Sequence, residues 1–294
     1  MTLRPSEVDD LWRFIVERDR VYVRRASGRP APWTDDPIIA DNHFTNVHRW
    51  RDPGTQWIAW HVLDMEITDP DDLLFILVAY RTLNRVATFE RFGFPPRDPR
   101  LAWEWVAELN RARELGWKVG SRRHQTSLAR TSMSLRWLAE RDYADAVWSA
   151  IDGVEAVGRL TRVNGLGPFY AIQVVADLLT VGGSKLGLAM GDDPATSLAV
   201  GSRSALHILM GGIDPTILVP NDQSGWRRSL ARQWRLSDEE RDALRELHQS
   251  QPAELSFPLT HVDIEHSLCE WNRYHKLTIG DPRIGRRVTR DRGA

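Results

Sequence analysis

Signals that start and stop α-helices recur along the whole chain, whereas alternating strand patterns are scarce. The first helix is predicted from apolar residues at helical spacing, with Ser6 as its N-cap. These apolar residues are Val8, Leu11, Trp12, Ile15 and Val16. The best alternating run, RVYVRR, is more simply the end of the same helix. These patterns predict an all-α fold.

Two further stretches have helix-capping residues at their ends. Asp98 is placed to cap a helix that Pro99 opens and that Gly116 ends. Ser237 and Glu240 have the spacing of a capping box. At the usual helix length the chain holds about ten or more helices. We expect one domain over 1–294, with helical lobes of about 1–120 and 121–280, a cleft between them, and a basic, mobile tail at 281–294.

Composition excludes several classes of protein. The formal net charge of −1 gives no global attraction to nucleic acid, so any DNA contact must come from a local patch. The single cysteine, Cys269, excludes an internal disulfide and fits a reducing cytosol. No signal peptide is evident, and the longest apolar run, LLFILVAY, is too short to span a bilayer. We expect a cytoplasmic monomer without a membrane partner, with most of its 13 tryptophans in the core.

The stretch RVNGLGPFYAIQVVADLL predicts a tight turn between two helices. Gly165 and Gly167 can adopt positive φ at low cost, and Pro168 favours the first helical position. Backbone N–H groups in such a turn, with the helix N-terminus, suit an anion such as a phosphate. A plain helical corner with a glycine stop would carry the same residues, and the motif alone does not decide between them.

Acidic residues after this turn are candidates for catalysis. Asp177 lies in an otherwise apolar stretch, where a carboxylate needs a partner or a function. Asp192 and Asp193 follow, directly before Pro194. A carboxylate beside a flipped base can accept a proton or stabilise positive charge, although Asp at this place could equally cap a helix.

Four motifs, in a fixed order, resemble one family of enzymes. They are FTNVHRWRDPGTQ at 44–56, RTLN at 81–84, GLGPFYAIQVVADL at 165–178 and EHSLCEWNRY at 265–274. Together they resemble the phage amino acid:DNA transferases, also called α-glutamyl/putrescinyl thymine pyrophosphorylases. The helical domain of 5-hydroxymethyluracil DNA kinases is related to that family. The chain departs from the family at VGSRSAL, where a G-P-G-A-x-x-G turn is usual, and at Pro53 and Gly54.

The resemblance implies a fold similar to the helix-hairpin-helix DNA glycosylases. It also implies transfer of an amino acid or another amine onto the pyrophosphorylated 5-hydroxymethyl group of a thymine-derived base in DNA, with release of pyrophosphate. The partners would be DNA containing modified thymine and an amine co-substrate, in a bacterial host cytoplasm, with a phage or a bacterium as the source. The alternatives are a glycosylase acting on a modified pyrimidine and a non-catalytic DNA-binding module. A kinase would require a G-x-x-x-x-G-K-[ST] loop, which this sequence lacks.

Amine transfer onto DNA assigns roles to three groups of residues. The candidates for catalysis, including acceptance of the proton of the amine, are Asp193, Asp177, Asp52 and Glu265. Arginines suit the pyrophosphate and amides suit the base, so the substrate-binding candidates are Asn46, Arg49, Gln56, Arg81, Asn84, Arg203 and Glu270. The DNA-binding candidates are Asn164, Gly165, Gly167 and Lys185. A Mg²⁺ ion could accompany the pyrophosphate, but the sequence has no dedicated metal motif.

The last motif has two neighbouring stripes when it is projected on a helix. One stripe is polar, at 265, 269, 272 and 276, and the other is mainly apolar, at 264, 268, 271 and 275. A solvated helix with paired surface charges would show the same pattern. The family resemblance instead implies that Glu265 and Glu270 line or support a site, and that Cys269 is a buried packing residue rather than a nucleophile.

Overall fold

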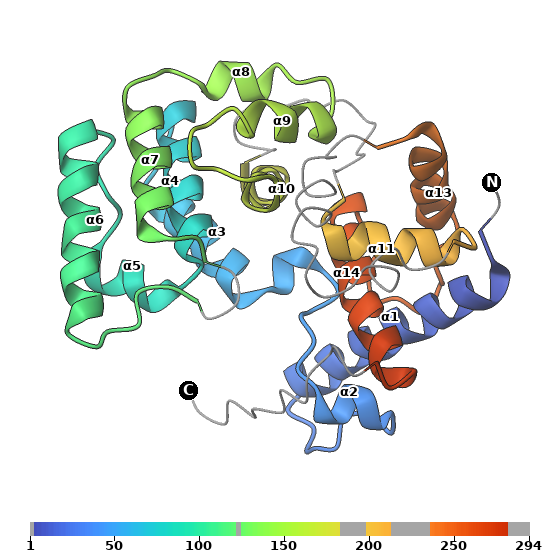
Figure 1. Cartoon of the computed structure of the whole chain (residues 1–294). Helices are drawn as coiled ribbons and strands as arrows, with labels where there is room; N and C mark the ends of the chain where they lie inside the picture. Colours follow the sequence, from blue (N-terminus) through green and yellow to red (C-terminus); the bar gives the residue numbers. More distant parts are fainter. Residues whose placement is uncertain (1–2, 122–124, 183–197, 213–235, 282–294) are drawn as a thin grey trace. The chain divides into compact units, whose positions relative to one another are not determined.

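The computed structural model of the chain describes residues 3–121, 125–182, 198–212 and 236–281 (Figure 1). Every regular element in these ranges is helical, and none of them is a strand. The all-α prediction is therefore confirmed for the described residues. None of the described helices is both long enough and apolar enough to cross a membrane. The chain divides into two compact units, unit 1 (Met1–Arg51 with Leu198–Ala294) and unit 2 (Asp52–Ser197).

Unit 1 is organised around its last helix, α14. Its described elements are α1 (Pro5–Ala26), α2 (Pro37–Asp41), the 3₁₀ turn η1 (Arg49–Arg51), α11 (Val200–Leu209), α13 (Asp238–Gln249) and α14 (His261–Thr278). Helix α14 contacts each of the other five, and α11 most extensively. A Cβ added to Gly201 would lie only 2.7 Å from the Cys269 sulfur. Glycine at this position therefore lets α11 approach α14 closely.

Unit 2 is organised around α4, whose residues from Leu73 to Leu83 are all buried. Its described elements are α3 (Pro53–Asp64), α4 (Pro70–Leu83), α5 (Val86–Phe92), α6 (Pro99–Glu114), α7 (Leu128–Ala139), α8 (Ala144–Trp148), α9 (Gly153–Leu160), α10 (Pro168–Asp177) and the π-helical turn η2 (Leu178–Gly182). Helix α4 contacts α3, α7, α8 and α10. This burial on all sides explains why LLFILVAY shows no polar face.

The two units divide the chain at different residues from the lobes that the sequence suggested. Helix α1 packs against α14, and both belong to unit 1 although they lie at opposite ends of the sequence. A lobe boundary near residue 120 would separate these packed helices. The pairing of distant helices leaves no mark in local periodicity, so the sequence patterns could not indicate it.

Several helix ends lie where the sequence placed them. The Asp98 side chain accepts hydrogen bonds from the backbone N–H groups of Arg100 and Leu101, at 2.9 and 2.8 Å. The Ser237–Glu240 capping box is also present. The predicted cap of the first helix is wrong: the N-cap is Arg4 rather than Ser6, because Pro5 takes the first helical position.

The expectation that most tryptophans lie in the core is also wrong for the described residues. Trp12, Trp105 and Trp271 are buried. Four others are exposed at the surface: Trp50, Trp60, Trp103 and Trp117. Their rings are therefore accessible for contacts with a partner.

Candidate functional site

A buried ion pair joins the end of α4 to the end of α10 in unit 2. The Arg81 Nη2 atom donates to Asp177 Oδ1 at 2.6 Å, and its Nε atom donates to the other carboxylate oxygen. The two side chains are only 3% and 0% exposed. Burial opposes the charge of Arg81, but mainly the Asp177 carboxylate offsets this, and the pKa of Arg81 is raised above its ordinary value. The acid that stood out on an apolar helix thus has a partner.

The same guanidinium group binds two further side chains. Arg81 Nη2 donates to Thr55 Oγ1 at 3.0 Å, and Arg81 Nη1 donates to Asn84 Oδ1 at 2.9 Å. Asn84 ends α4 in the left-handed region, with φ of 50°, which asparagine tolerates better than most residues. Arg81 therefore links α3, α4 and α10 and fixes the orientation of the Asn84 amide.

Asp52 lies next to this group at the start of α3. One of its carboxylate oxygens accepts hydrogen bonds from the Thr55 N–H at 3.0 Å and from the Thr55 hydroxyl at 3.3 Å. A Cβ on Gly54 would lie 2.5 Å from the Tyr80 hydroxyl and 3.2 Å from Asp52, so only glycine permits this approach. The Asp52 side chain is partly exposed, in contrast to the buried Asp177, and Gln56 is exposed one turn further along α3.

The predicted turn joins α9 to α10, and the two helices pack against each other. Gly165 has φ of 87°, and a Cβ there would lie 2.6 Å from the Arg130 carbonyl oxygen of α7. Gly167 is the N-cap of α10 in extended conformation, and a Cβ there would meet open space. Gly165 is therefore required both by its conformation and by packing, whereas Gly167 is required by neither. Asn164, between α9 and Gly165, is exposed.

Glu265 holds the start of α11 against α14 in unit 1. Its carboxylate accepts hydrogen bonds from the Ser202 hydroxyl at 2.5 Å and from the Ala199 N–H at 3.2 Å. The group caps a helix whose own N-cap residue, Ala199, has no side-chain acceptor. Burial raises the pKa of Glu265, and the contacts with Ser202, Ala199 and the charge of Arg49 only partly oppose the shift.

The remaining predicted residues of unit 1 also have internal contacts. The backbone N–H of Arg49 donates to Asp263 Oδ1 at 2.6 Å, and Asn46 Nδ2 donates to the Arg51 carbonyl at 2.7 Å. Arg203 and Glu240 form a buried ion pair with an Nε–Oε1 distance of 2.7 Å.

The polar stripe on α14 is largely buried rather than solvated. Glu265 and Asn272 are each only 5% exposed, because α11 packs against this helix. Glu270 is partly exposed and lies 3.7 Å from Arg273. Burial also raises the pKa of the Cys269 thiol, which disfavours the nucleophilic thiolate. The interpretation of the polar stripe as a solvated helix face is therefore wrong for α14.

The described residues include predicted site residues in both units. Asp193 and Lys185 lie outside the described residues. Unit 2 brings together Asp52, Arg81, Asn84 and Asp177, and unit 1 holds Asn46, Arg49, Arg203, Glu265 and Glu270. The sequence patterns did not indicate the polar partners of these residues, which are Thr55, Tyr80, Ser202, Glu240 and Asp263. Two of them had a usable local signal, since Glu240 and Asp263 are the acidic members of capping boxes with Ser237 and Thr260.

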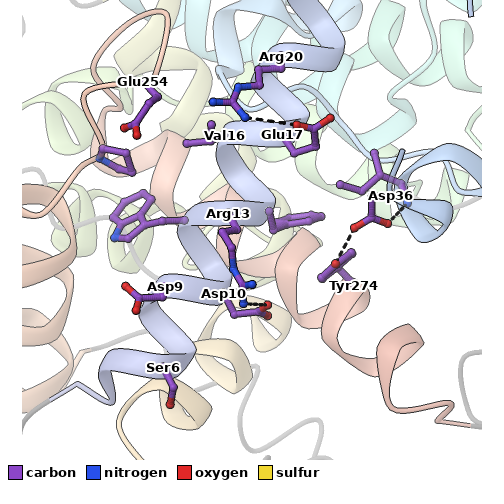
Figure 2. A pocket seen from close by; sticks show the side chains of 14 residues that line it. Ser6, Asp9, Asp10, Arg13, Val16, Glu17, Arg20, Asp36, Glu254 and Tyr274 are labelled. Carbon is purple, nitrogen blue, oxygen red and sulfur yellow. Dashed lines mark hydrogen bonds and ion pairs between the residues drawn. The ribbon is translucent and has the colours of Figure 1, made fainter. Parts of the chain in front are cut away.

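Unit 1 also has an open groove of about 990 Å³ beside α1 (Figure 2). Five carboxylates line it and only two arginines oppose them: Asp9, Asp10, Glu17, Asp36 and Glu254, with Arg13 and Arg20. This excess of negative charge repels phosphate groups. None of the predicted site residues lines the groove. Among the described residues, no group of three His, Cys, Asp or Glu side chains could hold a metal ion.

Comparison with known proteins assigns the chain to a family. The helical domain of 5-hmdU DNA kinase matches residues 6–283, which cover all of unit 2, most of unit 1 and every predicted site residue. The chain belongs to this family. A 5-hmdU DNA kinase of Bacillus phage SP10 is 32% identical over 122 residues, which cover 37% of this chain and 18% of that kinase. No solved structure matches the chain.

Membership of the 5-hmdU DNA kinase helical-domain family confirms the motif resemblance at the level of the related kinases. The chain spans less than a fifth of the curated relative's length, since the match covers 18% of that protein. The motif residues around Arg81 and those around Glu265 all lie within the matched helical domain. They form two internally bonded groups, one in each unit.

Proposed function

We propose that the chain modifies thymine-derived bases in DNA by transferring an amino acid or another amine to a pyrophosphorylated 5-hydroxymethyl group. The amine nitrogen would form a bond to the exocyclic carbon while the carbon–oxygen bond breaks and pyrophosphate leaves with the electron pair. The proton of the amine would pass to a carboxylate. One observation carries the proposal: residues from three separate motifs, Thr55, Arg81 and Asp177, meet in one hydrogen-bonded group.

The relative from phage SP10 is named a kinase, but phosphoryl transfer from a nucleotide is not the reaction that these residues support. The sequence has no G-x-x-x-x-G-K-[ST] loop to hold nucleotide phosphates. The chain matches the family of the helical domain of 5-hmdU DNA kinase, and 122 aligned residues relate it to that kinase. The family match and the lack of this loop in the sequence are both explained if the two proteins act on the same modified base but catalyse different reactions at its 5-hydroxymethyl group.

Among the described acids, Asp52 is the proposed proton acceptor. Its carboxylate is partly exposed, and the hydrogen bonds to Thr55 use only one of its two oxygens. Asp177 is fully buried and bound at both oxygens by Arg81. Asp177 and Arg81 are therefore proposed as positioning residues that hold Asn84 and Thr55. Asp193 stays a prediction outside the described residues.

The buried contacts of unit 1 favour supporting roles there as well. Arg203 is paired with Glu240, and Glu265 caps α11. Glu265 is buried and its carboxylate binds Ser202 and the Ala199 N–H, which suits a helix cap rather than a general base that must reach an exposed substrate. The roles of Arg49 and Arg203 in binding the pyrophosphate, and that of Glu265 in catalysis, stay predictions. A Mg²⁺ ion, if the reaction needs one, would be held through oxygens of the pyrophosphate and of acidic side chains.

The α9–α10 hairpin is proposed to hold a DNA phosphate in a glycosylase-like helix-hairpin-helix. Gly165 with its positive φ, Gly167 at the helix start and Pro168 at the first helical position support this assignment. Backbone N–H groups at such a turn favour an anion without a charged side chain. The base would then be extruded toward the polar residues at the end of α4.

The test uses DNA carrying the pyrophosphorylated base, the intact protein and a panel of amino acids and diamines. Mass analysis of the digested nucleosides is expected to show an adduct that requires both protein and amine. Abasic sites, detected by strand cleavage in alkali, would instead favour a glycosylase, and binding without turnover would favour a DNA-binding module.

The matched variants for this test are Asp52→Asn and Asp142→Asn. Asparagine caps helices as well as aspartate does, so Asp52→Asn is expected to fold while losing the proton acceptor. Asp142 is 91% exposed, and its substitution changes the net charge in the same way. The adduct yield is expected to fall with Asp52→Asn, by about 10²-fold or more, and to stay unchanged with Asp142→Asn.

A further inference from the structure

A second groove, in unit 2, is positively charged. It has a volume of about 420 Å³ and lies between the end of α6 and the start of α7. Arg113 and Lys118 line it, and no carboxylate among the described residues does. Trp117, also in the lining, is 48% exposed, and the guanidinium of Arg91 lies 3.5 Å from its ring centroid. We propose that this groove binds the sugar–phosphate backbone of a DNA strand beyond the phosphate at the α9–α10 hairpin.

The groove and the hairpin share the first turn of α7. Ser127 lines the groove and caps α7 by accepting a hydrogen bond from the Arg130 N–H at 3.3 Å. The carbonyl of the same Arg130 lies against Gly165 of the hairpin, where a Cβ would approach it to 2.6 Å. The Arg130 side chain is exposed; burial raises the pKa of Tyr170 on α10, and the positive charge of Arg130 partly opposes this rise. A strand held by the hairpin therefore meets positive charge on its way to the groove.

The groove is also tied to the proposed modification site. The N–H of Thr126, which lines the groove, donates to the Thr82 carbonyl, and the N–H of Ser121, next to the lining residue Gly120, donates to the Leu83 carbonyl, both at 2.9 Å. These two acceptors lie between Arg81 and Asn84 in the sequence of α4. The wall of the groove is thus fixed to the last turn of the helix that carries those two side chains.

The chemistry of the groove fits a nucleic acid backbone. Guanidinium and ammonium groups bind phosphates without regard to sequence, and an exposed indole can stack on an unpaired base. The negatively charged groove of unit 1 offers the opposite environment. Since the net charge of the chain is −1, this local concentration of positive charge is what DNA binding requires.

The inference rests on the proposed function for its partner, and the affinity of the intact protein for labelled DNA tests it. The probe is a 24-base-pair duplex containing 5-hydroxymethyluracil, titrated by fluorescence anisotropy between 50 and 200 mM NaCl. The double variant Arg113→Gln/Lys118→Gln is expected to bind more weakly. The slope of log K against log salt should become shallower by about 0.9 for each phosphate that the variant no longer neutralises.

Arg100→Gln is the control for a charge removed elsewhere on the surface, and it removes one positive charge where the double variant removes two. Arg100 is 79% exposed at the other end of the same helix as Arg113, about 20 Å away at 1.5 Å per residue. That distance exceeds the screening length at these salt concentrations. Arg100→Gln should therefore keep the wild-type slope.

The possible outcomes separate this inference from the proposed function. An unchanged slope in the double variant, together with weaker binding by a Gly165→Ala hairpin variant, overturns the proposal that the groove binds DNA. It leaves the proposed phosphate site at the hairpin supported. A reduced slope without any amine adduct supports the groove and contradicts the proposed reaction. A wild-type protein that does not bind the duplex contradicts both.

Discussion

Arg81 and Asp177, 96 residues apart in the sequence, form a two-point ion pair that is almost completely buried. Removing one partner leaves an uncompensated charge in the interior. Arg81→Gln is therefore expected to lower the free energy of unfolding by about 3–5 kcal/mol. Urea denaturation followed by circular dichroism measures this change.

The double variant Arg81→Met/Asp177→Leu is the control for this pair. It removes both charges, so it is expected to lose much less stability than Arg81→Gln alone. A loss below about 1 kcal/mol for the single variant would mean that the pair is not buried as described.

The two hairpin glycines are expected to differ in their tolerance of a methyl group. Gly165→Ala forces positive φ on alanine and places a Cβ against the Arg130 carbonyl and Ser134, and should cost about 1–3 kcal/mol. Gly167→Ala meets open space at φ of −85° and should cost less than about 0.5 kcal/mol. Thermal unfolding of the two variants gives the comparison. Equal losses would contradict the described hairpin.

The hairpin and the cluster at Arg81 show how far the sequence could lead. Local signals were enough to predict the turn, because Gly165, Gly167 and Pro168 determine the conformation of the backbone at their own positions. Asp177 was conspicuous as a polar residue in an apolar stretch, but its partner could not be identified from spacing. That partner lies on a helix distant in sequence, and only tertiary packing brings the two together.

The site in unit 1 shows a different limit. Helical projection placed Glu265 on a polar stripe, where a solvated surface and a buried contact look alike. Packing of α11 through Gly201 buries that stripe, and the need of α11 for a cap at Ala199 decides what Glu265 binds. Neither effect is local to α14, so its own pattern could not reveal them.

The raised pKa of Glu265 predicts a specific dependence of stability on pH. Because burial raises the pKa in the folded state above its unfolded value, ionisation costs the folded protein free energy. This unfavourable contribution to the free energy of unfolding is absent below the ordinary glutamate pKa. It grows as the pH rises from that value through the raised pKa of the folded state. Glu265→Gln keeps an acceptor for Ser202 and removes this cost, so its stability relative to wild type should increase over that window.

Denaturant unfolding of wild type and Glu265→Gln at several pH values tests the sign. Glu270→Gln removes a carboxylate from the same helix and controls for the general change in charge. A difference between Glu265→Gln and wild type that does not vary with pH would contradict the burial of this carboxyl.

The close approach of α11 and α14 at Gly201 predicts a compensating pair of substitutions. Gly201→Ala places a Cβ 2.7 Å from the Cys269 sulfur, and overpacking of this kind costs about 1–3 kcal/mol. Cys269→Ala removes that sulfur, so the double variant should lose less stability than the sum of the single losses. Strictly additive losses, measured in a double-mutant cycle, would show that the two residues do not touch.

Amine-dependent release of pyrophosphate from DNA tests the central claim most directly. With DNA carrying the pyrophosphorylated 5-hydroxymethyl base, the chain is expected to release one pyrophosphate for each amine adduct formed. Omission of the amine should stop both products together. Release of the free base, or the absence of any adduct from folded, DNA-bound protein across the whole panel of amines, would contradict the account.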